Sequence, residues 1–241
     1  MTMKKISKIL LCATLASVSA GVNANNDLDD LRNLAQDQFR DISEILGAAT
    51  SYKALTPAEP LGITGFDLGF ELTATNLDND LFDAASNGDW DLDYLPLPKI
   101  HVHKGLPFNI DVGAFYAGAS GTDIKLWGGE VRYAFIEGNV AIPAVSARLT
   151  YSRLEGVDDF DLQNMGIEVT VSKGFAIFTP YGGIGRIRTE SEVDNSPLDK
   201  ESIDMNKIFA GVNINLGVNF TLEGDITGGT KSFGLKVGFR F

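Results

Sequence analysis

The residues whose types most readily do chemistry are the two histidines of the sequence, His101 and His103. In a β-strand, alternate side chains lie on the same face, so both imidazoles would point in one direction. The apolar side chains of Ile100 and Val102 would point the other way. Imidazole can transfer protons near neutral pH or bind a metal ion. Three roles are therefore open for the pair: catalysis, weak metal binding, or a structural cluster of polar groups.

A second candidate is the segment 89–93, in which three aspartates alternate with Trp90 and Leu92. Alternating carboxylates are typical of the start of a calcium loop. Tyr94, however, occupies the position where an EF-hand requires glycine. We therefore expect a solvated acidic loop here, and the sequence predicts no dedicated metal site and no bound cofactor.

The elements that would position these side chains are strands, and the clearest is residues 230–241. Large apolar side chains alternate there with glycines and cations, so that a strand would have one apolar face and one wet face. In a soluble sandwich the apolar face would meet a second sheet, whereas in a membrane barrel it would meet lipid. The apolar positions are Phe233, Leu235, Val237, Phe239 and Phe241, and Lys236 and Arg240 share the opposite face.

Nine earlier segments repeat this alternation, which predicts ten strands. An even number is typical of single-chain bacterial barrels. Past the N-terminal region no run of eighteen apolar residues occurs, so a membrane could be crossed only by a closed barrel. The predicted fold is an all-β, antiparallel transmembrane β-barrel. The segments are 66–75, 97–104, 108–116, 127–135, 145–152, 166–172, 176–190, 207–216, 218–226 and 230–241, and the glycines of 176–190 hide its two faces.

The connections between these segments alternate in length, which supports the barrel. Short turns at one end and longer polar loops at the other are typical of outer-membrane barrels. Only 227–229 is short where a long loop is expected. The short connections are 105–107, 138–139, 173–174 and 216–217, and the longer, polar ones are 76–96, 118–123, 155–161 and 189–202. All of the longer ones except 118–123 are rich in acids.

The first residues, 1–24, have the pattern of a secretory signal peptide. A basic region is followed by the apolar run 9–18 and by a small-residue cleavage site at 22–24, with 18–20 as the alternative. Cys12 is the single cysteine, so the exported chain would have neither disulfides nor cysteine metal sites. The formal charge of −12 excludes ordinary nucleic-acid binding, which needs a basic surface.

Between the signal and the strands, residues 25–60 form an amphipathic helix and linker in our interpretation, followed by the barrel at 61–241. Acidic residues at the start and apolar residues at helical spacing predict a helix over residues 26–54. Pro57 and Pro60 would end it. Two placements remain open: a periplasmic helix packed on the barrel rim, or a plug inside the lumen.

The chain ends on an aromatic residue, Phe241, with Phe239 on the same strand face. This ending resembles the C-terminal signature of Gram-negative outer-membrane β-barrels, which the barrel assembly machinery reads. Residues 57–66 and 97–107 also resemble segments of proteobacterial barrel proteins that have no assigned activity. The resemblance implies location in the cell outer membrane, among lipids and lipopolysaccharide. Acidic external loops would there share divalent cations with lipopolysaccharide phosphates.

The side chains opposite the apolar positions would line the lumen. Cations and anions are nearly balanced among them, which predicts an interior of ion pairs and a narrow or closed channel. Lys207, and also Arg186 and Arg188 of the unclear segment, belong to this set. The other predicted lumen-lining residues are Asp67, Glu71, Lys99, His101, His103, Asp111, Glu130, Arg132, Arg148, Glu168, Glu223, Asp225, Lys236 and Arg240.

Three functions are compatible with these patterns. The first is a porin-like narrow passive channel or carrier for small solutes, including apolar ones. The alternative is a non-conducting structural or surface-recognition barrel that acts through its acidic external loops. The third is an outer-membrane enzyme, but His101 and His103 would lie inside the lumen near the periplasmic end. Omptin-like proteases and outer-membrane phospholipases place such residues at the outer rim or toward lipid. We therefore predict no catalytic residue.

Overall fold

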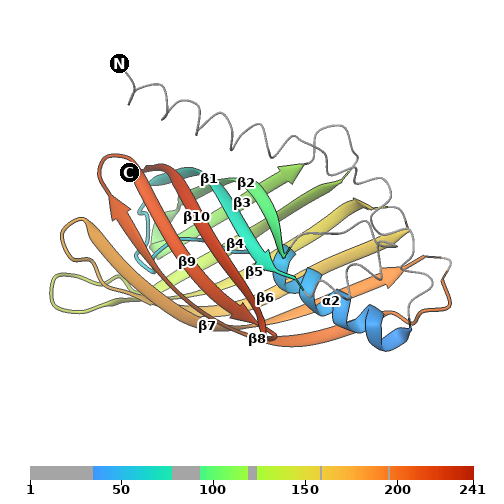
Figure 1. The fold of residues 1–241 in the computed structure, drawn as a ribbon. Helices are drawn as coiled ribbons and strands as arrows, with labels where there is room; N and C mark the ends of the chain where they lie inside the picture. The colour runs from blue at the N-terminus through green and yellow to red at the C-terminus, as the bar shows by residue number, and fades with distance from the viewer. Residues whose placement is uncertain (1–34, 78–92, 119–123, 158, 195) are drawn as a thin grey trace, which may run out of the picture.

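A computed structural model describes residues 35–77, 93–118, 124–157, 159–194 and 196–241. These residues form a single closed barrel with a helix at one end (Figure 1). The predicted signal peptide and residues 89–92 of the acidic segment lie outside the described residues.

The elements follow one another in a simple up-and-down order, and each strand pairs with its sequence neighbours in antiparallel fashion. Strand β1 also pairs with β10, which closes the barrel and confirms the predicted fold class. The elements are α2 (Gln36–Thr50), β1 (Phe66–Asn76), β2 (Tyr94–Gly105), the 3-10 helix η2 (Pro107–Asn109), β3 (Ile110–Gly118), β4 (Lys125–Ile136), β5 (Ala144–Val157), β6 (Phe160–Ser172), β7 (Phe178–Val193), β8 (Glu201–Asn215), β9 (Asn219–Thr227) and β10 (Thr230–Arg240).

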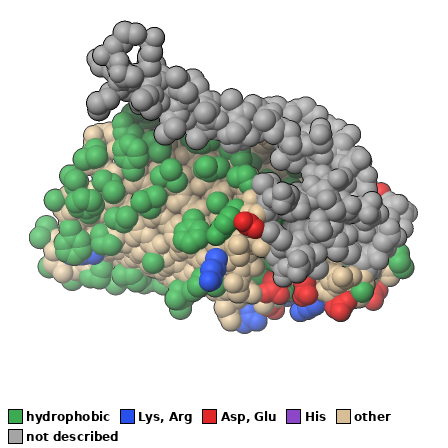
Figure 2. Space-filling model, viewed as in Figure 1, with side chains coloured by type: hydrophobic (Ala, Val, Ile, Leu, Met, Phe, Trp, Pro, Cys, Tyr) green, Lys and Arg blue, Asp and Glu red, His purple; other side chains and the backbone are tan. Residues whose placement is uncertain are grey.

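The strand alternation separates two environments. On β1, Leu68, Phe70 and Leu72 are exposed on the outside, whereas Asp67 and Glu71 are buried inside. Figure 2 shows hydrophobic side chains over much of the visible outer surface, with charged side chains gathered toward one end. A sheet that closes on itself leaves no unpaired edge, so it can hold an apolar outer surface in hydrocarbon.

The seam between the first and last strands places the end of the chain beside β1. The Phe66 amide donates to the Phe241 carbonyl at 2.7 Å, and the Phe241 amide donates to the Phe66 carbonyl at 3.0 Å. We call this end of the barrel the terminal end, and the opposite end, where β1 connects to β2, the loop end. The role of Phe239 and Phe241 as an assembly signal stays a prediction.

Two loop-end connections are shorter than the sequence predicted. Strands β5 and β6 are joined by residues 158–159 rather than 155–161, and β7 and β8 by 194–200 rather than 189–202. The pairing continues through polar residues, for example between Arg153 and Gln163. A hydropathy pattern ends where the outward residues become polar, but the backbone ladder does not require apolar side chains. These strands therefore extend beyond the apolar band.

The helix α2 lies inside the lumen, which decides between the two predicted placements. It contacts β5, β6, β7 and β8 and also β1 and β10, and its residues Ser43 and Gly47 lie against side chains on the inner face of β7. Phe39 and Ile42 are completely buried. The helix ends at Thr50 rather than at residue 54, and the chain then continues through the lumen to β1. No described helix combines the length and the apolar character needed to cross a membrane.

The helix α2 continues without a break through Gly47. This glycine allows the helix to approach β7 closely. A Cβ atom at residue 47 would lie 2.3 Å from Oγ1 of Thr189, which is well below the normal contact distance between a carbon and an oxygen atom. Any larger side chain would therefore push α2 away from the wall.

Candidate functional site

We call residues 36–61 the plug, because they pass through the lumen from the loop end to the terminal end. At the loop end, Gln36 exchanges two hydrogen bonds with the backbone of Asp199, at 2.8 and 3.0 Å. The Arg40 guanidinium lies 2.8 Å from the carboxylate of Glu201. The start of the plug is therefore attached to the β7–β8 connection and to the first residue of β8.

The last turns of α2 are bound by hydroxyl and amide groups of the wall. Ser191 donates to the Ser43 hydroxyl at 2.7 Å. Asn164 donates to the Thr50 hydroxyl at 3.0 Å, and Ser152 donates to the Thr50 carbonyl at 2.9 Å. Strands β5, β6 and β7 therefore hold the C-terminal end of the helix, where its carbonyl groups lack helical partners.

Between α2 and the terminal end, the plug contributes one buried charge. The Lys53 ammonium donates to both oxygens of the Asp225 carboxylate, at 2.9 and 3.0 Å, and to the Ala48 carbonyl at 3.3 Å. Both charged side chains are at most 2% exposed. Lys53 was not among the predicted lumen-lining residues, because its sequence position falls in the predicted helix 26–54, whose placement the pattern leaves open.

The two histidines lie beside the plug. His103 Nε2 is 3.1 Å from the hydroxyl of Tyr52, a plug residue, and His101 Nε2 is 2.5 Å from Glu71. A Cβ atom on Gly113 would lie 2.2 Å from the His103 ring, so this glycine makes room for the contact. Among the described residues, no group of three or more His, Cys, Asp or Glu side chains is arranged to hold a metal ion.

At the terminal end, Arg132 binds the plug to the wall. Its guanidinium donates to Asp111 at 2.5 and 3.1 Å. It also donates to the Thr56 hydroxyl at 3.0 Å and to the Pro57 carbonyl at 2.5 Å. Asp111 in turn accepts a hydrogen bond from the Leu61 amide. A completely buried arginine therefore fixes the segment through which the plug joins β1.

The remaining charges of the lumen wall pair with one another. Lys207 lies 2.7 Å from Glu168, and Lys236 lies 3.0 Å from Asp67. Tyr181 donates to Glu223 at 2.7 Å. In the described part of the chain, the lumen holds seven cations and eight anions. The cations are Lys53, Lys99, Arg132, Arg148, Lys207, Lys236 and Arg240, and the anions are Asp67, Glu71, Asp111, Glu130, Glu168, Glu201, Glu223 and Asp225.

The structure places all fourteen predicted lumen-lining residues on the inner face, and all but Arg240 are buried. Arg186 and Arg188 are different: their side chains are 64% and 57% exposed on the outer surface. They lie near Asp204 and Glu190 there. Glycines on β7 concealed which face was which, so the predicted direction of these two arginines is wrong.

Toward the loop end the lumen is apolar, which the sequence analysis did not predict. The ring of Phe39 on α2 meets Phe160 of β6 edge-on, with ring centroids 6.4 Å apart and an interplanar angle of 84°. We call the wall side chains that surround this face of α2 the apolar zone. They are Phe115, Leu126, Leu154, Phe160, Leu162 and Val193, and they pack against Phe39, Ile42 and Leu46 of the helix.

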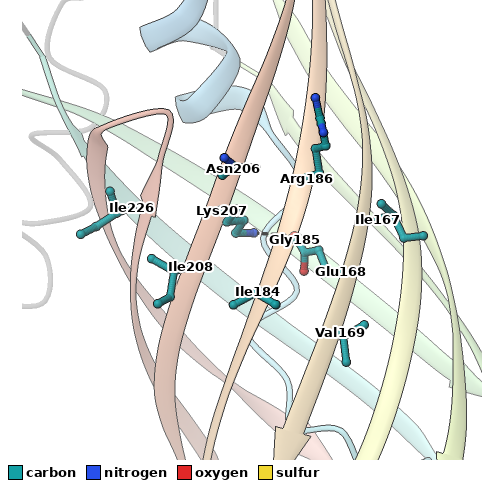
Figure 3. A pocket seen from close by; sticks show the side chains of 10 residues that line it. All are labelled: Ile167, Glu168, Val169, Ile184, Gly185, Arg186, Asn206, Lys207, Ile208 and Ile226. Atoms are coloured by element: carbon teal, nitrogen blue, oxygen red, sulfur yellow. Dashed lines mark hydrogen bonds and ion pairs between the residues drawn. The ribbon is translucent and has the colours of Figure 1, made fainter.

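A groove of about 580 Å³ lies on the outside of the barrel, over β6 to β9 (Figure 3). Ile167, Ile184 and Ile208 line it and are exposed, so the groove belongs to the outer surface. Figure 3 also shows Glu168 and Lys207 joined by their ion pair behind this wall. The groove therefore lies on the outer surface of the barrel.

A closed antiparallel barrel with an apolar exterior and a polar, charged interior defines an outer-membrane β-barrel protein. Its outer surface is in contact with membrane lipids. Within this class, the chain belongs to the family of unknown function DUF6588, whose model matches residues 67–227, more than half of the chain. The match covers β1 to β9, and the plug lies outside it.

The chain is also similar to solved structures at low sequence identity. The N-terminal β-barrel domain of Pseudomonas aeruginosa OprF is 16% identical, with 75% of this chain and 99% of that chain covered and a TM-score of 0.37. Ail, the attachment invasion locus protein of Yersinia pestis, is 13% identical, with 76% and 99% covered and a TM-score of 0.36. A search of curated proteins gave no significant match.

Proposed function

We propose that this protein is a gated barrel, closed while the plug is docked, through which small solutes pass when the plug moves. The plug occupies the lumen from Gln36 at the loop end to Leu61 at the terminal end. A passage along the lumen therefore requires displacement of α2 and of the segment that follows it. The proposal specifies that the predicted passive channel or carrier is closed at rest.

The observation that carries the proposal is the polar character of the contacts between the plug and the wall. A permanently filled interior has no need of buried charges, since replacing a buried ion pair with packed apolar groups is often neutral or stabilising. The pair of Lys53 and Asp225 and the hydrogen bonds of Arg132 are groups that water could solvate. Such contacts suit a plug that leaves and returns.

Charge balance suggests what would pass. With the plug docked, Lys53 compensates Asp225. Withdrawal of the plug would remove Lys53 and leave Asp225 without this partner. We therefore expect the open lumen to favour neutral or cationic solutes over anions.

A specific observation favours the alternative, a non-conducting structural or surface-recognition barrel. The plug is bonded along its whole length, at Asp199, Asp225 and Asp111 among other sites. If these bonds never break, the lumen never opens and the protein would act through its loops. We propose no catalytic role for His101 and His103, because both contact buried groups of the plug or the wall.

A reversible lock on the plug tests the proposal. Replacing Ser43→Cys and Ser191→Cys would place two sulfurs where hydroxyl oxygens lie 2.7 Å apart, close enough for a disulfide. The natural chain has only Cys12, within the predicted signal peptide. In planar bilayers, we expect the oxidised variant to be closed and the reduced variant to show the openings of the unmodified protein.

The controls are the two single-cysteine variants, which should conduct like the unmodified protein under oxidising conditions. Conductance of the oxidised double variant equal to that of the reduced one would show that the lumen is not the path. Absence of conductance and of solute uptake in every variant would instead favour the non-conducting alternative.

Orientation gives a separate prediction. We expect the loop end to face the cell exterior, and therefore residue 35, at the start of the plug, to lie outside as well. A membrane-impermeant maleimide added to intact cells should label Ala35→Cys and Lys200→Cys. It should label Val140→Cys, which is 99% exposed at the terminal end, only after the outer membrane is permeabilised. The reverse pattern would show that the plug enters from the periplasmic side.

A further inference from the structure

The apolar zone raises a question that the gating proposal alone does not answer. If α2 left the lumen, Phe115, Leu126 and Phe160, each 3% exposed in the closed state, would face water. Exposure of a contiguous apolar surface opposes opening. The charged half of the lumen has no such difficulty, because water can solvate its ion pairs. Opening is therefore infrequent in the absence of a ligand, and it is favoured when another apolar group replaces the apolar face of the helix.

The walls of the apolar zone indicate the chemistry of that replacement. All six of its wall side chains are hydrocarbon or aromatic. Among the described residues, the wall groups that hydrogen bond to α2 between Ser43 and Thr50 are uncharged, namely Ser152, Asn164 and Ser191. They could bind one or two hydroxyl or carbonyl groups of a ligand, whereas a charged group would lose its water here without a partner.

The floor of the site is aromatic. The Phe115 ring lies 5.3 Å from the ring of Tyr52 and is stacked on His101 at 5.4 Å, with an interplanar angle of 16°. Flat aromatic surfaces accept both aliphatic chains and rings. The site is therefore suited to a molecule with an extended apolar surface.

We propose that the apolar zone is a binding site for a small uncharged apolar molecule, aliphatic or aromatic, which binds by displacing α2. This inference rests on the proposed gating, and it names the class of ligand that drives it. The helix and the ligand compete for the same surface, so the ligand shifts the barrel toward the open state. A molecule that bound without displacing α2 could not have this effect.

The test follows the position of the helix directly. Ser191 is 1% exposed and lies beneath Ser43 of α2, so a Ser191→Cys variant should react slowly with a charged thiol reagent. Saturation with N-phenyl-1-naphthylamine, an uncharged aromatic probe, should accelerate the reaction at least tenfold in nanodiscs. The sulfonated analogue 1-anilinonaphthalene-8-sulfonate, which carries a charge, should not.

The locked variant supplies the background for binding. With the oxidised Ser43→Cys/Ser191→Cys variant, the fluorescence of N-phenyl-1-naphthylamine should come only from probe bound to lipid and to the outer surface of the barrel. Reduction of the disulfide should increase the fluorescence, because the probe can then displace α2. A Leu126→Thr variant, checked for folding by its heat-modifiable migration in gels, should weaken the effect of the probe. Equal fluorescence in the oxidised and reduced states, or labelling of residue 191 that the probe does not change, would overturn the inference.

The two experiments distinguish a failure of the apolar-ligand inference from a failure of the gating proposal. If the lock closes the channel but the probe has no effect, the gate stands and the apolar ligand does not. If the probe accelerates labelling although no variant conducts, the ligand site stands in a barrel that does not transport.

Discussion

Replacing Asp225 with alanine is expected to release the plug from the lumen. The Lys53 ammonium lies 2.9 Å from this carboxylate, and both side chains are at most 2% exposed. Removing one partner of a buried ion pair costs about 3–5 kcal/mol, because the other charge stays buried without compensation. Each 1.4 kcal/mol is a factor of ten in an equilibrium, so the undocked population should rise roughly a hundredfold or more.

The measurement is again the rate at which a charged thiol reagent modifies Ser191→Cys, now in the Asp225→Ala background. Lys53→Met combined with Asp225→Leu is the matched control, because it removes both charges and should return the rate close to that of the parent. Lys53→Met alone should have a smaller effect, since Thr227 still donates to Asp225 at 2.9 Å. An Asp225→Ala variant as slow as its parent would show that this pair does not hold the plug.

The barrel itself was predictable from the sequence, because a strand facing lipid must alternate. Hydrocarbon accepts no unpaired polar group, so Leu68, Phe70 and Leu72 had to share a face opposite Glu71. The same rule gave the strand number and the ion-paired interior. It applies only within the apolar band, which is why the ends of β5 to β8 extended beyond the predicted limits.

Residues that do not touch lipid obey no such rule. Arg186 and Arg188 lie on the outer surface, where β7 carries charges beside Glu190 and Asp204. An outward arginine beside glycines looks, in the sequence, like a lumen arginine. Likewise, no periodicity tells whether an amphipathic helix packs on a rim or inside a lumen, since both bury one face.

The sequence does indicate the apolar zone, through apolar residues at lumen-facing positions, but the general alternation of the strands obscured them. On β6, Phe160 and Leu162 have the same parity as Glu168 and Thr170, and so lie on the inner face. Apolar residues at lumen positions predict that something apolar fills the lumen at that height. The helix residues Phe39, Ile42 and Leu46 supply it.

Truncation of Phe39 to alanine is expected to undock α2 without changing any charge. This ring is completely buried and meets Phe160 edge-on. Phenylalanine-to-alanine changes in a packed core cost about 3–5 kcal/mol, partly because a cavity remains. Labelling of Ser191→Cys should therefore accelerate strongly in the Phe39→Ala background. Phe70→Ala, a truncation of the same size on the lipid-facing surface, should leave the rate unchanged because its ring is already 48% exposed.

The cavity left by Phe39→Ala leads to a second expected result, in which a ligand slows the labelling of residue 191. An enclosed apolar cavity stays dry and can bind benzene. Benzene should fill the space of the missing ring, return α2 to the wall and slow the labelling of residue 191. The larger N-phenyl-1-naphthylamine should accelerate it in the parent, because that probe needs the volume of the helix and not of one side chain. If benzene failed to slow labelling in Phe39→Ala, the space around residue 39 would be open to water, and the packing of α2 in the apolar zone would not be what closes the lumen.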